Sequence, residues 1–430
     1  MGKTVYIKTF GCQMNVHDSE KMLGIMEKQG YSSIDDIRKA DVIIFNTCSI
    51  RQKAEQKFYS ELGRIKSFKK KRPDTRIVVA GCIAQHEGET IFKTAPHVDM
   101  IFGPQNIHIL DNITAGKIPP VAVNDNPGIA MHDLPVKRSD GIKAWVTIMY
   151  GCNNFCSYCI VPFTRGRERS RPSENIYEEV SELAQKGYKE ITLLGQNVNS
   201  YRSDMDFPGL LKKLNKVRGI ERIRFVTSHP RDLSDELINA ISELDKVCEH
   251  IHLPLQSGSS SILRLMNRGY SYDNYLQKVT KLRRKVPLIS ITSDIIAGFP
   301  GETEENHQST IKALKEIEFE GIFAFKFSKR PGTKAAEIPE QLNESIKSER
   351  LEEILRIQDE ITSSKNKYLE GSVQEILLEG YSETDKDKFT GRTRTNKIVT
   401  IVNNNFDNGT LINVEITKGR RHSLEGKPLR

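Results

Sequence analysis

Residues Gly151 to Pro172 read GCNNFCSYCIVPFTRGRERSRP, and most of our expectations start from this stretch. Its three cysteines, Cys152, Cys156 and Cys159 (the loop triad), have the spacing C-x3-C-x2-C and directly follow the apolar segment AWVTIMY. Three thiolates on one short loop can hold one face of an iron-sulfur cluster. A structural zinc site needs four ligands in paired spacings, and no fourth ligand follows nearby. The three thiols could instead be structural, although thiols so densely placed on a loop are seldom inert.

Short apolar segments recur after this loop at fairly even intervals, as the strands of an α/β protein do. The six segments are AWVTIMY, EITLLGQNV, RIRFVTSHP, EHIHLPLQS, SITSDIIAGF and GIFAFKFS. Each of the first five precedes a helical pattern, such as PSENIYEEVSELAQKG with apolar residues at Ile176, Val180 and Leu183. This alternation predicts six strand-helix units in a partial (β/α)6 barrel.

Polar residues stand at the carboxyl ends of these predicted strands, where barrels of this class carry their function. They are Gln196, Asn197, Asn199, Ser228, His229, Gln256, Ser257 and Gly298. Polar groups that converge on one mouth can orient a small molecule, although any single one could instead be a strand cap or a turn residue. The segment GFPGET lacks the Lys-Ser/Thr ending of a Walker loop, so ATP hydrolysis is not supported.

A second set of three cysteines is spread through the first hundred residues. Cys12, Cys48 and Cys82 (the dispersed triad) end the strand-like runs VYIKTFGC, DVIIFNTC and RIVVAGC, with helical segments between them. Strand, helix and strand at this period predict a parallel sheet, whose strand ends lie along one edge. The three thiols are therefore expected to meet at the edge where open α/β sheets bind ligands. The alternative is three separate buried thiols, and the seventh cysteine, Cys248, is expected to be a packing residue of that kind.

Four arginines alternate along the end of the opening stretch, at Arg165, Arg167, Arg169 and Arg171. In an extended segment this period puts all four guanidinium groups on one side. A row of guanidinium groups beside the loop triad suits recognition of phosphate or carboxylate. One or two of them could instead pair with acidic groups nearby, such as Glu168.

These motifs together resemble a known family. C-x3-C-x2-C after a first barrel strand is the signature of radical S-adenosylmethionine enzymes, and GCQMNVHDSE, NTCSIR and VAGC resemble the N-terminal domain of methylthiotransferases. The resemblance implies two [4Fe-4S] clusters, one on each triad. The cluster on the loop triad would bind S-adenosylmethionine and cleave it to a 5′-deoxyadenosyl radical, while the auxiliary cluster on the dispersed triad would carry the sulfur.

The resemblance also assigns the polar strand-end residues to S-adenosylmethionine, because LLGQN, HLPLQSG and DIIAGFPGE match segments typical of the family. The expected cofactor-binding residues are Gln196, Asn197, Ser228, His229, Gln256, Ser257 and Gly298, together with Arg165 and Arg167.

The remaining sequence predicts a linker and a third domain. We expect an N-terminal α/β domain at residues 1–118, a proline-rich linker at 119–140, the radical barrel at 141–368 and a small antiparallel β-barrel at 369–430. The last of these resembles TRAM, an RNA-binding barrel. Its basic residues suit neutralisation of RNA phosphates, and those expected to bind RNA are Arg392, Arg394, Lys397, Arg420 and Arg421.

The composition limits the partners and the compartment. Lysine and arginine exceed aspartate and glutamate by 8, which permits a polyanionic partner. No signal-like segment and no run of about eighteen apolar residues is present, so we expect a cytoplasmic protein with no membrane partner. In a reducing compartment, clustered cysteines indicate metal binding or catalysis rather than disulfides.

The residues around Cys12, GCQMN, resemble the MiaB-type branch of the methylthiotransferases. This implies a transferase that adds sulfur and a methyl group at C2 of the N6-isopentenyladenosine adjacent to the anticodon of tRNA. The implied partners are the anticodon stem-loop, a flavodoxin- or ferredoxin-like electron donor and a source of sulfur. The alternatives are methylthiolation of threonylcarbamoyl adenosine or of a ribosomal protein aspartate, or an RNA-binding protein whose clusters are structural or carry electrons.

Overall fold

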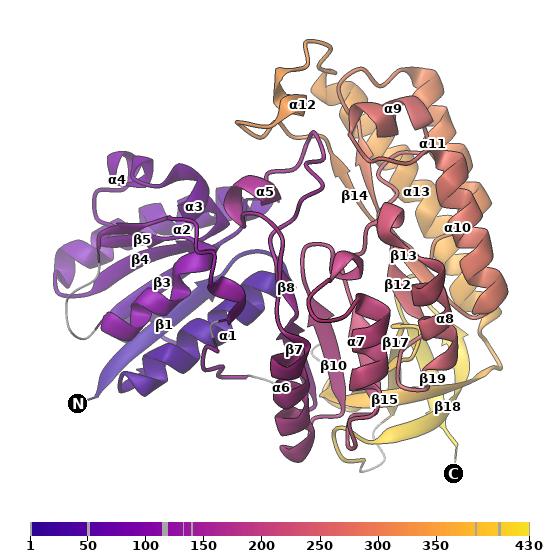
Figure 1. Ribbon diagram of the computed structural model, residues 1–430, viewed down its shortest axis with the longest axis horizontal. Helices are drawn as coiled ribbons and strands as arrows, with labels where there is room; N and C mark the ends of the chain where they lie inside the picture. Colours follow the sequence, from indigo (N-terminus) through magenta and orange to yellow (C-terminus); the bar gives the residue numbers. More distant parts are fainter. Residues whose placement is uncertain are drawn as a thin grey trace.

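The computed structural model describes residues 2–49, 52–113, 119–131, 133–138, 141–382, 385–402 and 406–429. Three units follow one another along the chain, with the N-terminal sheet domain beside the central domain and the C-terminal barrel at its foot (Figure 1). The predicted domain boundaries at residues 118 and 140 lie outside the described residues.

The N-terminal unit is a six-stranded sheet in which every pairing is parallel, so the predicted parallel-sheet domain is confirmed. Its strands, in spatial order, are β2 (Tyr31–Ser33), β1 (Lys3–Thr9), β3 (Val42–Thr47), β4 (Arg76–Gly81), β5 (Met100–Phe102) and β6 (Val121–Ala122). Its helices are α1 (Gln13–Lys28), α2 (Gln52–Lys71), α3 (Cys82–Glu87) and α4 (Thr90–Thr94). Strand β6 comes from the segment predicted as linker.

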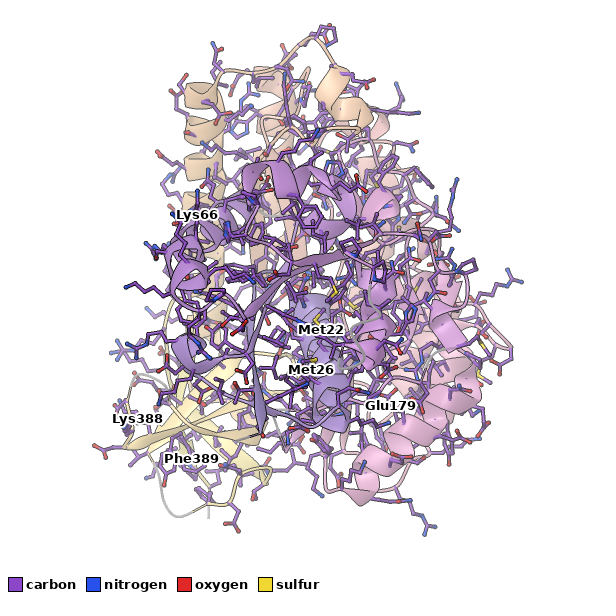
Figure 2. All side chains as sticks on the ribbon, turned by 90° about the vertical axis from the view of Figure 1, so that its left-hand side faces the viewer. Met22, Met26, Lys66, Glu179, Lys388 and Phe389 are labelled. Carbon is purple, nitrogen blue, oxygen red and sulfur yellow. The ribbon has the colours of Figure 1, made fainter. Side chains whose placement is uncertain are left out.

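Apolar residues on both faces explain why this sheet is covered on both sides. Ile44 in β3 packs with Met22 and Met26 of α1, which Figure 2 labels along that helix. The next residue, Phe45, points to the opposite face and packs with Phe58 of α2. A central strand buried on both faces is the mark of a parallel sheet, and its carboxyl ends share one edge.

The central unit carries six strands in sequence order around a partial barrel, as predicted. Two parallel three-stranded sheets, β11-β10-β7 and β12-β13-β14, are joined by a parallel bridge between Ile223 and Val247. The strands are β7 (Lys143–Thr147), β10 (Glu190–Leu194), β11 (Arg222–Phe225), β12 (His250–His252), β13 (Ser290–Ala297) and β14 (Gly321–Lys326). The main helices are α6 (Ser173–Gln185), α7 (Phe207–Leu214), α8 (Asp235–Glu243), α9 (Ser260–Leu265), α10 (Tyr272–Lys285) and α11 (Glu304–Ile317).

The 25-residue helix α13 (Glu344–Tyr368) leads from the central domain into the C-terminal unit. That unit is a closed five-stranded barrel in which four pairings are antiparallel and one, between β17 and β19, is parallel. Its strands are β15 (Val373–Tyr381), β16 (Lys388–Thr393), β17 (Ile398–Val402), β18 (Leu411–Gly419) and β19 (Leu424–Pro428). None of the helices in the described ranges has the length and apolar character that a membrane span requires.

The C-terminal barrel is fastened to the first residues of the central strands. Arg222, at the start of β11, has 0% of its surface exposed and donates to the carbonyl of Arg392 and the carboxylate of Glu375, both at 2.7–2.8 Å. Arg224 donates to the carbonyls of Thr393 and Arg394 at 2.8 Å. Because parallel strands share one polarity, this barrel lies at the end of the central domain opposite to the loops that carry the predicted site.

Candidate cluster and cofactor site

The loop triad lies in the connection between two short antiparallel strands, β8 (Met149–Tyr150) and β9 (Arg169–Ser170). Gly151 connects β8 to Cys152 with a φ of +71°, and a Cβ atom there would lie 2.0 Å from the carbonyl oxygen of Arg167. Only glycine permits this close approach. The backbone amide of Ser157 donates to the carbonyl of Met266, which ties the loop to the segment after α9.

The three thiols of this loop lie close enough to influence one another. Burial raises the pKa of Cys152 to about 11 and that of Cys159 to about 12, and the neighbouring Cys156 acts in the same direction. At neutral pH the thiols of Cys152 and Cys159 are therefore protonated in the metal-free protein. Binding of iron would supply the positive charge that holds all three as thiolates, with release of protons.

Four residues with side chains adopt a left-handed backbone on the loops around this site. They are Phe155 (φ 46°) within the loop triad, Thr227 (φ 69°) after β11, Gln256 (φ 74°) after β12 and Asn267 (φ 56°) after α9. Such conformations cost of order 1–3 kcal/mol each and persist where the surrounding structure holds them, most often at functional sites. Thr227 is the strongest case because its branched Cβ makes this region especially unfavourable.

Four of the predicted cofactor-binding residues have a buried polar atom without a hydrogen-bond partner among the described residues. These atoms are Gln196 Oε1, Asn197 Oδ1, Ser228 Oγ and His229 Nε2. A buried polar atom left unpaired costs about 1–3 kcal/mol, and four of them at the ends of two neighbouring strands form one set. Their donor and acceptor types fit the hydroxyl, amine and carboxylate groups of S-adenosylmethionine, so the residues present suit that cofactor.

The tautomer and the charge of the His229 ring follow from its surroundings. Its Nδ1 accepts a hydrogen bond from the backbone amide of Arg231 at 3.2 Å, so the proton of the neutral ring lies on Nε2. Burial lowers the pKa of His229 to about 2, and the nearby positive charges of Arg268 and Arg231 act in the same direction. The ring is therefore a neutral donor at physiological pH, and it presents an N–H group that no atom of the described residues accepts.

The other strand-end residues are engaged within the protein. Asn199 donates to the carbonyl of His229 at 2.9 Å, and Ser257 Oγ accepts from the backbone amide of Ser259 at 3.2 Å. Gly298 packs against α13, because a Cβ atom there would lie 2.5 Å from Lys347 Cγ. The backbone of Gln256 bridges to β13 through Asp294 and Ile296. Ser257 and Gly298 thus shape the mouth without an unpaired polar group of their own.

The dispersed triad lies at the carboxyl ends of three neighbouring strands, with Cys12 after β1, Cys48 after β3 and Cys82 after β4. Gly11 (φ +134°) brings two of these loops together, since a Cβ atom there would lie 2.5 Å from Cys48 Cβ. Burial raises the pKa of Cys82, an effect that Cys12 reinforces and Arg165 opposes. The structure therefore places all three thiols along one edge of the sheet.

Neither triad is arranged as ligands of a single ion. Within the described ranges, no three Cys, His, Asp or Glu side chains are grouped in a way that could hold one metal ion. In a four-iron cluster each thiolate binds a different iron atom, so the thiols surround a larger object. Ser49, next to Cys48, has a buried Oγ with no hydrogen-bond partner among the described residues, which leaves a polar group for such an object.

The four alternating arginines do not form a row, so that expectation was wrong. Helix α5 (Val161–Thr164) and the turn at Gly166 precede the two-residue strand β9, and the chain is therefore not extended over the whole segment. Arg165 pairs with Asp18 of α1 at 2.8 Å, Arg169 with Asp125 and Arg171 with Glu179. Of the two predicted as cofactor-binding, Arg165 lies beside the dispersed triad, and Arg167 is exposed and stacks on Phe155 with its guanidinium carbon 4.3 Å from the ring centre.

The five residues predicted to bind RNA have partners within the protein. Arg394 forms a two-pronged ion pair with Glu249 of the central domain at 2.8 Å, and Lys397 donates to Asn366 of α13 at 2.8 Å. The others pair with carboxylates, namely Arg392 with Glu379, Arg420 with Glu425 and Arg421 with Asp359. Arg394 and Lys397 thus face the interface with the central domain, whereas Arg420 and Arg421 are exposed.

A group of buried and half-buried polar side chains lies where the N-terminal domain meets the central domain. Lys21 of α1 donates to the hydroxyl of Tyr150 at 3.0 Å, and Arg138 and Arg171 both pair with Glu179 of α6, at 2.6 and 2.7 Å. These groups line a cavity of about 280 Å³ between the two domains, and Figure 2 labels Glu179 on its helix. Tyr150 directly precedes the loop triad, so this group fixes that loop relative to α1.

Sequence reasoning missed several of these residues. Asp18 and Lys21 are charged residues inside a helix, and Arg268 is one of many arginines, so their types alone give no signal. Each is buried, and each acts through a partner more than a hundred residues away in the sequence.

Known protein families match all three units. The models that match are an uncharacterized protein family, UPF0004, at residues 4–103, the Radical SAM superfamily at 146–314 and the TRAM domain at 360–429. A solved structure with the same fold is the radical S-adenosylmethionine methyltransferase TsrM from Kitasatospora setae, with a TM-score of 0.60 at 15% identity over 78% of this chain and 75% of that one.

Curated relatives match over almost the whole chain. The tRNA-2-methylthio-N(6)-dimethylallyladenosine synthase of Thermodesulfovibrio yellowstonii is 56% identical over 99% of this chain and 98% of its own length. The enzyme of that name from Carboxydothermus hydrogenoformans is 47% identical over 99% of both chains. The sequence identity to these relatives agrees with the two cysteine triads and with the polar residues at the strand ends of the barrel. The chain therefore belongs to the radical S-adenosylmethionine methylthiotransferase family of tRNA-2-methylthio-N(6)-dimethylallyladenosine synthases.

Proposed function

We propose that the protein methylthiolates C2 of N6-isopentenyladenosine adjacent to the anticodon of tRNA. The observation that carries the proposal is the loop triad together with four buried polar atoms, at the ends of β10 and β11, that find no hydrogen-bond partner in the part of the chain that the structure describes. The relatives that share 47–56% of the sequence are named for the same product.

The target explains why such a site is needed. An aromatic C–H bond offers no acidic proton and no leaving group, so acid-base or nucleophilic groups alone have no point of attack. When bound, the cluster and S-adenosylmethionine supply a radical that can take a hydrogen atom from this carbon. The residues of the chain then have to bind the cofactors, orient them toward the substrate base and enclose the site.

The chain's own residues divide these tasks. Cys152, Cys156 and Cys159 would hold the [4Fe-4S] cluster, and the unpaired atoms of Gln196, Asn197, Ser228 and His229 would orient S-adenosylmethionine over it. The neutral His229 ring contributes an N–H donor without adding a second positive charge beside the sulfonium.

We assign the auxiliary [4Fe-4S] cluster, and with it the sulfur to be inserted, to the dispersed triad. Arg165 supports this assignment because it extends from the loop that follows Cys159 to Asp18 and Cys82 in the N-terminal domain. A buried side chain from the segment after the loop triad thus reaches the dispersed triad.

The partners follow from the same scheme. The substrate is the anticodon stem-loop, whose unstacked bases can enter a protein pocket at low energetic cost. A flavodoxin- or ferredoxin-like protein would supply electrons, and a separate source would supply sulfur. These reactants are those of the cytoplasm, where we place the protein.

Mass spectrometry of tRNA nucleosides tests the proposal. Anaerobically reconstituted protein, incubated with isopentenylated tRNA, S-adenosylmethionine, sulfide and a reductant, should yield the 2-methylthio nucleoside. The same assay on tRNA carrying threonylcarbamoyl adenosine should give no methylthio product. Product on the second substrate alone would overturn the assignment.

Replacement of His229 by leucine is expected to weaken S-adenosylmethionine binding by about 10- to 100-fold, because a buried hydrogen bond of about 1.5–3 kcal/mol is lost. His229→Gln, whose side-chain amide can donate from a similar position, should recover part of this loss. Equilibrium binding to the reconstituted protein measures both. Because the pKa of His229 is about 2, the contribution of its hydrogen bond to the affinity should not vary between pH 6 and 9. An affinity of wild type that falls as the pH is lowered toward 6.5 would contradict the assignment of a neutral ring.

A further inference from the structure

Arg268 is a buried arginine that contacts the loop triad directly. It follows α9, and 5% of its surface is exposed. Its Nη1 donates to Cys156 Sγ at 3.3 Å and to the hydroxyl of Tyr158 at 3.4 Å. Its Nη2 donates to the carbonyl of Pro254 at 2.9 Å, and its Nε donates to the hydroxyl of Tyr270 at 2.9 Å.

None of these partners carries a negative charge. No carboxylate of the described residues forms an ion pair with Arg268, and its neighbours are two phenols, one carbonyl and one thiol. A buried cation without a counter-ion costs several kcal/mol, so such a residue is stable only if something else neutralises it. A [4Fe-4S]²⁺ cluster with three thiolate ligands has a net charge of −1, and its one-electron-reduced form has a net charge of −2.

A second buried arginine, Arg165, shows the contrast. Arg165, beside the dispersed triad, pairs with the buried carboxylate of Asp18 at 2.8 Å, so that pair is neutral overall. Near the loop triad, the carboxylate that acts on Cys152 is Glu168, and burial raises its pKa. Glu168 and Arg268 act on the pKa of Cys152 in opposite directions, but they form no ion pair with each other.

From this geometry we propose that Arg268 sets the reduction potential of the cluster on the loop triad, by stabilising its reduced form through the N–H···S hydrogen bond to Cys156 and a fixed positive charge. The inference rests on the proposed function, because it requires a cluster at that site. Hydrogen bonds to the sulfurs and local charge are two of the means by which proteins adjust such potentials.

The surroundings of Arg268 hold it in place for this role. The hydroxyl of Tyr270 accepts from Nε and donates in turn to the carbonyls of Pro254 and Leu255 at 3.1 Å. Hydrogen bonds to Tyr270 and to the carbonyl of Pro254 thus fix the orientation of the planar guanidinium group, whether or not the cluster is reduced. A lysine would keep the charge but could not reproduce this arrangement.

A redox titration of the full chain tests the proposal. Reconstituted wild type and Arg268→Met are titrated anaerobically with titanium(III) citrate, which gives one electron per cluster, and the EPR signal that responds to S-adenosylmethionine is followed. We expect the ratio of reduced to oxidised cluster at a given potential to fall at least tenfold in Arg268→Met, a shift of 59 mV to more negative potential for a one-electron couple.

Two further variants make the result specific. Arg264→Met removes the same charge from an exposed arginine on α9 and should leave the midpoint unchanged. Arg268→Lys should give a smaller shift in the same direction as Arg268→Met. The inference is overturned if Arg268→Met shifts the midpoint no more than Arg264→Met does.

Folding and cluster loading are checked by circular dichroism and iron content. If Arg268→Met does not take up iron, Arg268→Lys is the deciding variant. A midpoint potential shifted further than in Arg264→Met supports the inference, and a midpoint potential shifted no further overturns it. If wild type shows no signal that responds to S-adenosylmethionine, the proposed function itself fails. An unmoved midpoint with a normal wild-type signal refutes the role of Arg268 alone.

Discussion

Replacement of Cys156 by alanine is expected to abolish the reductive cleavage of S-adenosylmethionine. Cys156 is the central thiol of the loop triad, buried and held by Arg268 at 3.3 Å. With two thiolates left, the cluster has no third anchor, and Arg268 loses its sulfur partner. The rate of 5′-deoxyadenosine formation should fall about a thousandfold or more, equal to about 4 kcal/mol of activation free energy.

Liquid chromatography of 5′-deoxyadenosine under dithionite measures this rate, and iron analysis should show about half the wild-type iron content. Cys248→Ala is the matched control, because Cys248 is also buried and lies away from both triads, two residues before β12. It should keep normal iron and activity, with a loss of stability of about 1 kcal/mol. Full cleavage activity in Cys156→Ala would show that the loop triad does not hold the cluster that cleaves the cofactor.

Replacement of Cys48 by alanine is expected to separate the two halves of the reaction. Cys48 lies in the dispersed triad and 1% of its surface is exposed, so its loss should remove the auxiliary cluster and leave the loop triad intact. 5′-Deoxyadenosine should still form at a rate within a few fold of wild type, whereas the methylthiolated nucleoside should fall about a thousandfold or more, about 4 kcal/mol. One reaction mixture yields both products for measurement.

Two results with Cys48→Ala would contradict this assignment. Loss of both products in Cys48→Ala, with a normal circular dichroism spectrum, would mean that the dispersed triad supports cleavage itself rather than sulfur transfer. Normal methylthiolation in Cys48→Ala would mean that this triad has no part in the reaction. Zinc in place of iron in anaerobically purified wild type would contradict both assignments.

The local patterns of the sequence predicted the parts of this protein that depend on short-range order. The spacing of Cys152, Cys156 and Cys159 places three thiols on one loop whatever surrounds it. The alternation of apolar segments and helical patterns predicted the central barrel, and the position of Cys12 after a strand predicted its place at a sheet edge. Strand ends meet because parallel strands share a direction, so these inferences needed no knowledge of distant contacts.

The charged side chains were much harder to predict. The alternation of Arg165 to Arg171 suggested one row, but helix α5 and the turn at Gly166 break the extended chain. Arg394 counted as an RNA-binding residue because few acids stand near it in sequence, yet Glu249 meets it across a domain interface. A long, flexible arginine side chain pairs with whichever carboxylate the fold brings near it, and that carboxylate is often far away in the sequence.

By itself, the sequence determined which groups this protein has for chemistry: six cysteines in two sets, the strands that carry them, and the order of three domains. Only the tertiary structure decided how their charges are balanced. It placed Arg165 against Asp18, left Arg268 with neutral partners beside Cys156, and left the donor of His229 without an acceptor among the described residues. The reason is physical, since the cost of a buried charge or polar group depends on what lies within a few ångströms, and folding alone sets those neighbours.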